Sequence, residues 1–168
     1  MGPTRALERI GVFLHVMALG LFLGTIGELF AVKHYGEPIK LLPIALCVIG
    51  CLALAAAWLR PSRRGLQSVR GLMVFTLIGS LIGVYEHIQG NLELSQEIHR
   101  HMATMARIKA VLTGRNPLAA PGMLAVAALL LIAATYVTEA LAKPGAGRAE
   151  KGEAEVRKPT PMRAWRSA

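Results

Sequence analysis

Long apolar runs alternate with short polar segments along the first 142 residues of the chain. Each run is bounded by Pro, Gly or a cluster of charge, and the runs cover residues 10–32, 41–59, 71–88 and 117–142. At 1.5 Å per residue, the first run is about 34 Å long as a helix, whereas a hydrocarbon core is about 30 Å thick. The pattern therefore predicts an all-α membrane protein with four transmembrane helices in residues 1–142.

The first run has an alternative interpretation as a cleaved signal peptide. Arg5 and Arg9 precede it and resemble the positively charged region of such a peptide. The run is too long for that interpretation, and Leu29-Phe30-Ala31 is a poor cleavage sequence. We interpret it as a retained helix.

Lysine and arginine are distributed unevenly between the two sides of the four spans. Thirteen lie before the first span, between the second and third spans, or after Ala142, against six in the other two connections. Because positive charge is retained inside, both termini are predicted to be cytoplasmic. Residues 143–168 lack periodicity and are predicted to form a disordered basic cytoplasmic tail.

The composition supports helices in lipid. Hydrophobic residues make up 54% of the chain, charged residues 17% and aromatic residues 5%, and aspartate is absent. This aliphatic composition is atypical of a β-barrel.

The net charge of the chain is +9, and much of this charge lies on basic residues that flank apolar spans. Membrane topology therefore explains the charge better than nucleic-acid binding does. We expect the chain to contact the lipid bilayer and to form a homo-oligomer or to join a larger membrane complex. Cys47 and Cys51 share one helix face and are interpreted as small packing residues.

Two halves of the chain share a pattern. Gly20, Gly24, Gly27 and Glu28 in the first span have the same relative spacing as Gly79, Gly83, Glu86 and His87 in the third. The second and fourth spans also align, from Pro43 and Pro121. The pattern predicts two tandem helical hairpins of the same orientation.

The Gly-x-x-x-Gly pairs suggest how these helices pack. Small residues let helix backbones approach closely in lipid, where packing rather than the hydrophobic effect joins helices. We expect Gly20 and Gly24 to pack against Gly79 and Gly83 within one chain. A homodimer seam is the competing interpretation.

That pairing would place Glu28 near Glu86 or His87 at the outer rim of the bundle, as a proton-responsive cluster. Glu97 and His101 lie one helical turn apart just beyond the third span. These five residues are the candidate metal ligands.

The outer loop has two further interpretations. His99, His101, Met102 and Met105 would alternatively suit a soft ion such as copper. We favour the other interpretation, in which residues 91–113 form an amphipathic helix on the outer membrane surface and its charged residues are only a solvated face.

His15 lies near the inner face, too far from His87 for the two to share one haem iron. It is expected to pair with Glu139 instead. The residues identify no cofactor.

One segment has a family resemblance. The run Gly83-Val-Tyr-Glu-His-Ile-Gln-Gly-Asn-Leu-Glu, followed by Asn116-Pro-Leu-Ala-Ala-Pro-Gly and the fourth span, resembles a group of small uncharacterised bacterial four-helix membrane proteins. Its most specific part is Tyr85, Glu86, His87, Gly90, Asn91 and Glu93. The resemblance covers about the second half of the chain and implies a location in the bacterial cytoplasmic (inner) membrane, without implying an activity.

No nucleophile elbow, phosphate loop or zinc-protease motif occurs in the sequence, so we expect no enzymatic activity. The first functional hypothesis is a non-catalytic accessory or assembly subunit. The alternative is a metal- or proton-binding component for transport or sensing that uses the Glu and His cluster at the outer rim.

Overall fold

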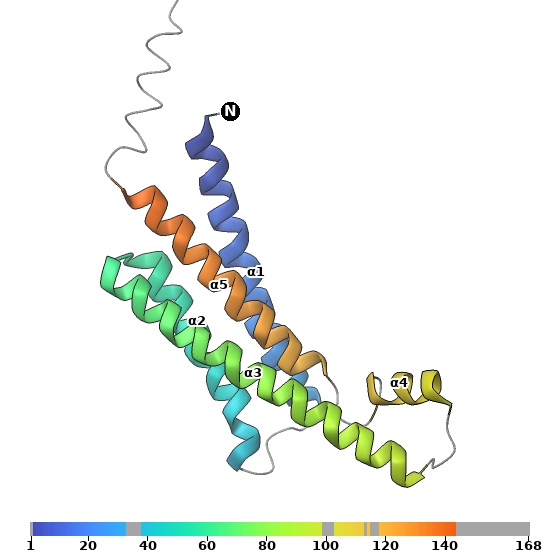
Figure 1. Ribbon diagram of the computed structural model, residues 1–168. Coiled ribbons are helices and arrows are strands. Elements are labelled where there is room, and N and C mark those ends of the chain that lie inside the picture. The colour runs from blue at the N-terminus through green and yellow to red at the C-terminus, as the bar shows by residue number, and fades with distance from the viewer. Residues whose placement is uncertain (1, 33–37, 99–102, 113, 115–117, 144–168) are drawn as a thin grey trace, which may run out of the picture.

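The computed structural model describes residues 2–32, 38–98, 103–112, 114 and 118–143. Its elements follow in the order α1 (Pro3–Ala31), η1 (Pro38–Leu41), α2 (Leu42–Leu59), α3 (Arg63–Ile98), α4 (Thr104–Leu112) and α5 (Ala119–Ala142) (Figure 1). Helices α1, α2, α3 and α5 are long and apolar enough to cross a membrane. The prediction of four helices long and apolar enough to cross a membrane is confirmed. The predicted tail lies outside the described residues, apart from Lys143.

The first and third helices are longer than their apolar runs. Helix α1 begins at Pro3, because proline suits the first helical position, where its missing N–H is not needed. Helix α3 begins after Ser62, whose side-chain oxygen accepts a hydrogen bond of 3.0 Å from the backbone N–H of Gly65. Hydropathy marks only the part of a helix that suits lipid, so it missed both extensions.

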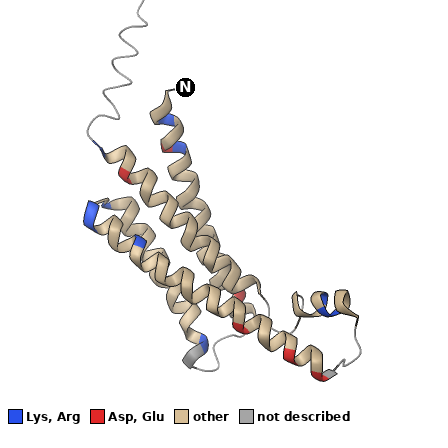
Figure 2. Ribbon diagram, viewed as in Figure 1, with Lys and Arg blue, Asp and Glu red and all other residues tan. Residues whose placement is uncertain are grey.

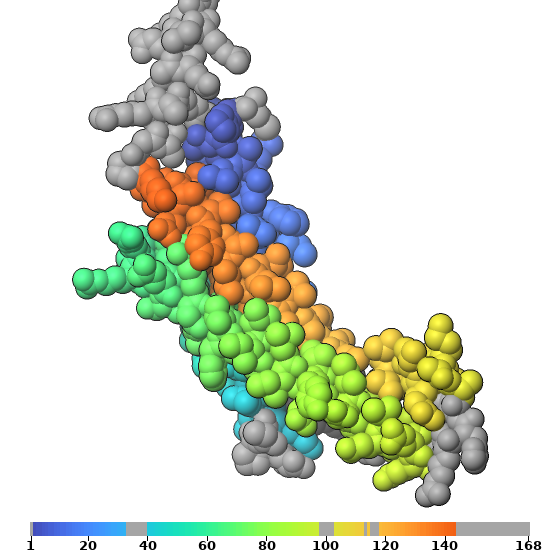
Figure 3. Space-filling model, in the orientation of Figure 1, coloured from blue at the N-terminus to red at the C-terminus, as the bar shows by residue number. Residues whose placement is uncertain are grey.

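The connection between α3 and α5 differs from the single loop helix predicted over residues 91–113. Residues 91–98 continue α3, and α4 covers only Thr104–Leu112. The Asn91 side chain is 2% exposed and donates a hydrogen bond of 2.9 Å to the carbonyl oxygen of Val111. This bond holds α4 beside the end of α3, where α4 projects from the bundle (Figure 3).

The four long helices bury residues at alternating spacings of three and four. This spacing is typical of helices that pack lengthwise in a four-helix bundle. The buried stripes are Gly11, His15, Ala18, Phe22, Thr25 and Leu29 on α1; Cys47, Gly50, Leu54 and Ala57 on α2; Leu66, Val69, Met73, Thr76 and Ser80 on α3; and Ala120, Leu124, Ala127, Leu131 and Ala134 on α5.

Helix α5 is the most buried of the spanning helices. In its most apolar window 44% of the residues are buried, against 28% or less in the other three. Ala120, Ala127 and Ala134 recur every seven residues on its buried face. These small residues let α5 pack closely against both α1 and α3.

Helices α1 and α3 do not contact each other, because they lie at opposite corners of the bundle. The predicted pairing of their glycines within one chain is therefore wrong. A Cβ atom added at Gly20, Gly24 or Gly79 would meet nothing within 4 Å. At Gly83 it would lie 3.5 Å from Cβ of Pro121, which belongs to α5.

Two glycines outside that prediction, Gly50 and Gly11, lie in close contact with a neighbouring long helix. A Cβ atom added at Gly50 of α2 would lie 2.6 Å from the ring of Phe22, and one at Gly11 would lie 3.1 Å from Cγ1 of Val137. Phe22 is fully buried, so its ring has little room to move. Gly50 therefore sets how closely α1 and α2 approach.

The outer surface of the bundle is apolar. Phe13 is 61% exposed, Leu52 66% and Phe75 67%, as expected of side chains that contact lipid. Charged residues lie mainly toward the two ends (Figure 2). We call the end with the start of α1 and the α2–α3 turn the proximal end, and the end with the starts of α2 and α5 the distal end.

Candidate functional site

A cavity of about 360 Å³ opens at the distal end of the bundle. Its walls come from α1, α2, α3 and α5, and η1 contributes Lys40. They are mostly apolar, with Leu29, Leu46, Ile82 and Leu124 among them. We call this space the distal cavity.

The polar members of the distal cavity include three predicted site residues. Glu28 reaches it from α1, and Glu86 and His87 reach it from α3. They come together across a cavity closed on one side by α5, rather than through the expected contact between α1 and α3. Ser80 also lines the cavity, although the sequence pattern did not single it out.

Local packing fixes where Glu28 and Ser80 lie. Glu28 precedes Leu29, the last member of the buried α1 stripe, which is 3% exposed. Ser80 continues the α3 stripe one turn after Thr76 and is also 3% exposed. Both side chains are therefore held against the interior of the distal end.

Two oxygen atoms in the cavity wall lack hydrogen-bond partners among the described residues. They are Oε2 of Glu28 and Oγ of Ser80, and both are buried. A buried polar atom without a partner costs about 1–3 kcal/mol, and a carboxylate in lipid costs more. A ligand or a proton at this position would remove part of that cost. Buried Thr76 shows the contrast, because its hydroxyl donates a hydrogen bond of 3.0 Å to the carbonyl oxygen of Leu72.

The metal version of the predicted site is not formed by the described residues. No group of three or more His, Cys, Asp or Glu side chains in them lies close enough to hold a metal ion. Glu97 is exposed near the end of α3 and does not line the distal cavity. His99, His101 and Met102 lie outside the described residues, and Met105 on α4 is 79% exposed.

The predicted pair of His15 and Glu139 is not made. Oε2 of Glu139 lies 2.6 Å from Nη2 of Arg70, with which it forms a salt bridge between α5 and α3. Arg70 also donates from Nε to Oγ1 of Thr135 at 2.9 Å and from Nη2 to the Thr135 carbonyl oxygen at 3.1 Å. Its guanidinium carbon lies 3.8 Å from the ring centroid of Tyr136.

This arginine site was missed because Arg70 was counted among the charges of the connecting loop. The extension of α3 back to Arg63 brings Arg70 inside the bundle. One signal was available, since Thr135 and Glu139 are four residues apart and share a face of α5. Together they offer several acceptors to one guanidinium group.

Comparison of the chain with protein-family models, with curated proteins and with solved structures found no match.

Proposed function

We propose that the chain is a non-catalytic integral membrane protein that binds a lipophilic amine in the distal cavity, as a component of transport or sensing. The observation that carries this proposal is the pair of buried oxygen atoms without a partner among the described residues, Oε2 of Glu28 and Oγ of Ser80, in a mostly apolar wall that also includes Lys40, Glu86 and His87. A volume of about 360 Å³ lies within the range of small-molecule sites, roughly 300–1,000 Å³.

The chemistry of the wall defines the ligand class. A protonated amine has several N–H donors and a positive charge that complements the Glu28 carboxylate. Its hydrocarbon body would cover apolar residues such as Leu46 and Leu124. Glu86 is exposed at the same cavity and offers a second carboxylate to an approaching cation.

A proton is the second candidate ligand at this position. A protonated Glu28 would carry its own donor, and Ser80 lines the same cavity as an acceptor. The unpartnered Oε2 favours this candidate as well, because protonation removes the cost of a buried charge.

The accessory or assembly subunit is the remaining alternative, and one observation favours it. Gly20, Gly24 and Gly27 are exposed on one side of α1, and an added Cβ at each would meet nothing within 4 Å. Such a surface accepts another helix in lipid. It would support a homo-oligomer or a larger membrane complex.

The orientation in the membrane belongs to the same proposal. The excess of lysine and arginine at the proximal side supports a cytoplasmic location for that end and for both termini. The distal cavity then opens toward the outer face of a bacterial cytoplasmic membrane. We also propose that the chain arose from two tandem helical hairpins, α1 with α2 and α3 with α5.

Calorimetric titration of the purified full chain in detergent tests the ligand proposal. Decylamine and 1-decanol have equal chain lengths, and we expect the amine to bind about tenfold more tightly because of its charge-assisted bond to Glu28. Glu28→Gln should remove that preference. Glu93→Gln, which changes an exposed carboxylate on α3 outside the cavity, should retain it.

Two results would contradict the proposal. One is equal binding of the amine and the alcohol by the unchanged protein, and the other is an amine preference that persists in Glu28→Gln. Failure of both compounds to bind would favour the accessory subunit instead.

A further inference from the structure

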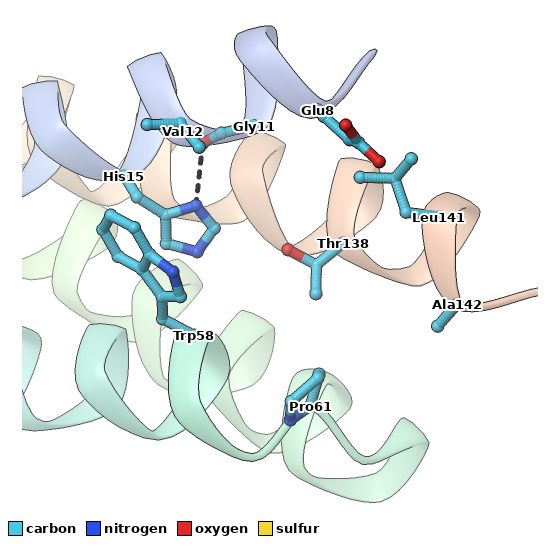
Figure 4. A pocket seen from close by; sticks show the side chains of 9 residues that line it. All are labelled: Glu8, Gly11, Val12, His15, Trp58, Pro61, Thr138, Leu141 and Ala142. Atoms are coloured by element: carbon cyan, nitrogen blue, oxygen red, sulfur yellow. Dashed lines mark hydrogen bonds between the residues drawn. The ribbon is translucent and has the colours of Figure 1, made fainter. Parts of the chain in front are cut away.

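A second cavity of about 360 Å³ lies at the proximal end, between α1, α2 and α5. Its wall includes Glu8, His15, Trp58, Pro61 and Thr138 (Figure 4). None of these residues lines the distal cavity. We call this space the proximal cavity.

The imidazole of His15 is the most buried ionisable group in this wall, at 4% exposed. Its Nδ1 atom lies 2.8 Å from the carbonyl oxygen of Gly11. Because a carbonyl oxygen can only accept, Nδ1 must carry the hydrogen. The other nitrogen, Nε2, then presents a lone pair in the neutral ring.

Nε2 of His15 is buried and has no hydrogen-bond partner in the part of the chain that the structure describes. The ring extends from α1 toward the space beside Trp58 and Thr138 (Figure 4). The indole of Trp58 lies with its centroid 4.9 Å away, tilted by 48°, and so restricts the orientation of the imidazole. An acceptor fixed in this way and left without a donor suits a ligand better than it suits packing.

Most of the remaining polar groups of the proximal cavity also accept hydrogen bonds or attract positive charge, although the indole N–H of Trp58 is a donor. Glu8 supplies a carboxylate, and Trp58 supplies the face of an aromatic ring. The Thr138 hydroxyl donates to the carbonyl oxygen of Ala134 at 2.9 Å, which leaves its lone pairs for a donor. Among the described residues, no lysine or arginine lines this cavity, whereas Arg63 and Lys143 line a neighbouring one.

The spacing along α1 excludes a single metal ion bound by both Glu8 and His15. The two residues are seven apart, which is about 10 Å along a helix axis. Metal ligands lie only about 2 Å from their ion. A molecule several atoms long, with a cationic group at one end and a donor at the other, matches this spacing.

We propose that the proximal cavity binds a small organic cation whose far end carries an O–H or N–H donor. The cationic group lies by the Glu8 carboxylate, the body of the ligand lies against Trp58, and the far donor bonds to Nε2 of His15. This site is independent of the distal cavity and of the function proposed for it.

Two matched amines test this proposal on the purified full chain. Tyramine and phenethylamine differ only in the phenol hydroxyl, which is the group proposed to meet Nε2. By calorimetric titration we expect tyramine to bind about tenfold more tightly, the factor that corresponds to one hydrogen bond to a buried acceptor. Equal affinity for the two amines, or no binding of either, would overturn the proposal.

Variants locate the two contacts. His15→Phe keeps a ring beside Trp58, and it should abolish the difference between tyramine and phenethylamine. Glu8→Gln changes an exposed side chain and should weaken both amines severalfold without affecting the fold. Glu97→Gln, on an exposed site away from the cavity, is the control.

A variant with Trp165 replaced by Phe leaves Trp58 as the single tryptophan, so its fluorescence reports both folding and binding. Quenching of Trp58 by tyramine is expected in this background. A preference for tyramine that survives in folded His15→Phe protein would overturn the assignment of Nε2, and unchanged affinity in Glu8→Gln would overturn the assignment of the cation.

Discussion

Glu139 and Glu28 are partly buried carboxylates in spanning helices, at opposite ends of one bundle. Glu139 has its charge matched by Arg70 at 2.6 Å, in a site where the guanidinium also bonds to Thr135. Oε2 of Glu28 is buried without a partner among the described residues. The contrast indicates that the proximal carboxylate contributes to the stability of the bundle, whereas the distal one is available for a ligand or a proton.

The largest expected effect is on the paired carboxylate. Arg70→Ala removes the cation that pairs with Glu139 and bonds to Thr135 between α3 and α5, so we expect the largest loss of unfolding free energy among these variants. Denaturant titration followed by circular dichroism in detergent would measure it. Arg64→Ala, at an exposed position in the first turn of α3, is the control and should change little. Similar losses for both variants would refute the structural role of the arginine site.

The next largest effect concerns the packing between α1 and α2. Gly50→Ala places a Cβ atom 2.6 Å from the ring of Phe22 in a fully buried position. Overpacking of this kind costs about 2 kcal/mol. The same denaturant titration applies, and an unchanged unfolding midpoint would show that α1 and α2 are not in such close contact.

At the distal end, removal of an unpartnered group should not destabilise the protein. Ser80→Ala deletes a buried hydroxyl that lacks a partner, so we expect the stability to stay the same or to increase by up to about 1 kcal/mol. Thr76→Ala, one turn earlier, instead removes a hydroxyl bonded to Leu72 and leaves a void in the core. A marked loss of stability in Ser80→Ala would mean that the hydroxyl has a structural partner.

The smallest effect is expected at the exposed glycines. Gly24→Ala adds a methyl group that meets nothing within 4 Å, and alanine favours a helix over glycine by roughly 0.5–1 kcal/mol. The monomer should therefore be unchanged or slightly stabilised. Sedimentation of this variant tests the alternative role of the surface, because loss of an oligomer would show that these glycines join two copies of the chain.

The number of helices that could cross a membrane was predictable from the sequence, because each apolar run is long enough to cross a hydrocarbon core as a helix. The sequence did not predict which helices touch. The glycine spacing on α1 and α3 indicated a contact between these two helices. A small residue allows close packing only where another helix faces it, and α5 lies between α1 and α3. The alanines at 120, 127 and 134 were the better signal, since their spacing of seven marks a buried face.

The candidate site was predictable in part. Similar offsets in the two halves brought Glu28, Glu86 and His87 into one group, and these residues do line one cavity. Ser80 and the cavity were not predictable, because an empty space depends on the side chains that surround it rather than on any motif. The Arg70 site was missed because the start of α3 is polar and was assigned to a loop.

Cysteine accessibility tests the central claim that the distal end contains a ligand cavity. In a background with Cys47 and Cys51 replaced by Ala, Ser80→Cys would place a thiol in the cavity wall, and Thr76→Cys would place one in the packed core one turn away. A small membrane-permeant thiosulfonate should modify the first much faster than the second, and decylamine should slow the first reaction. Equally slow modification of both thiols, unaffected by the amine, would contradict the account.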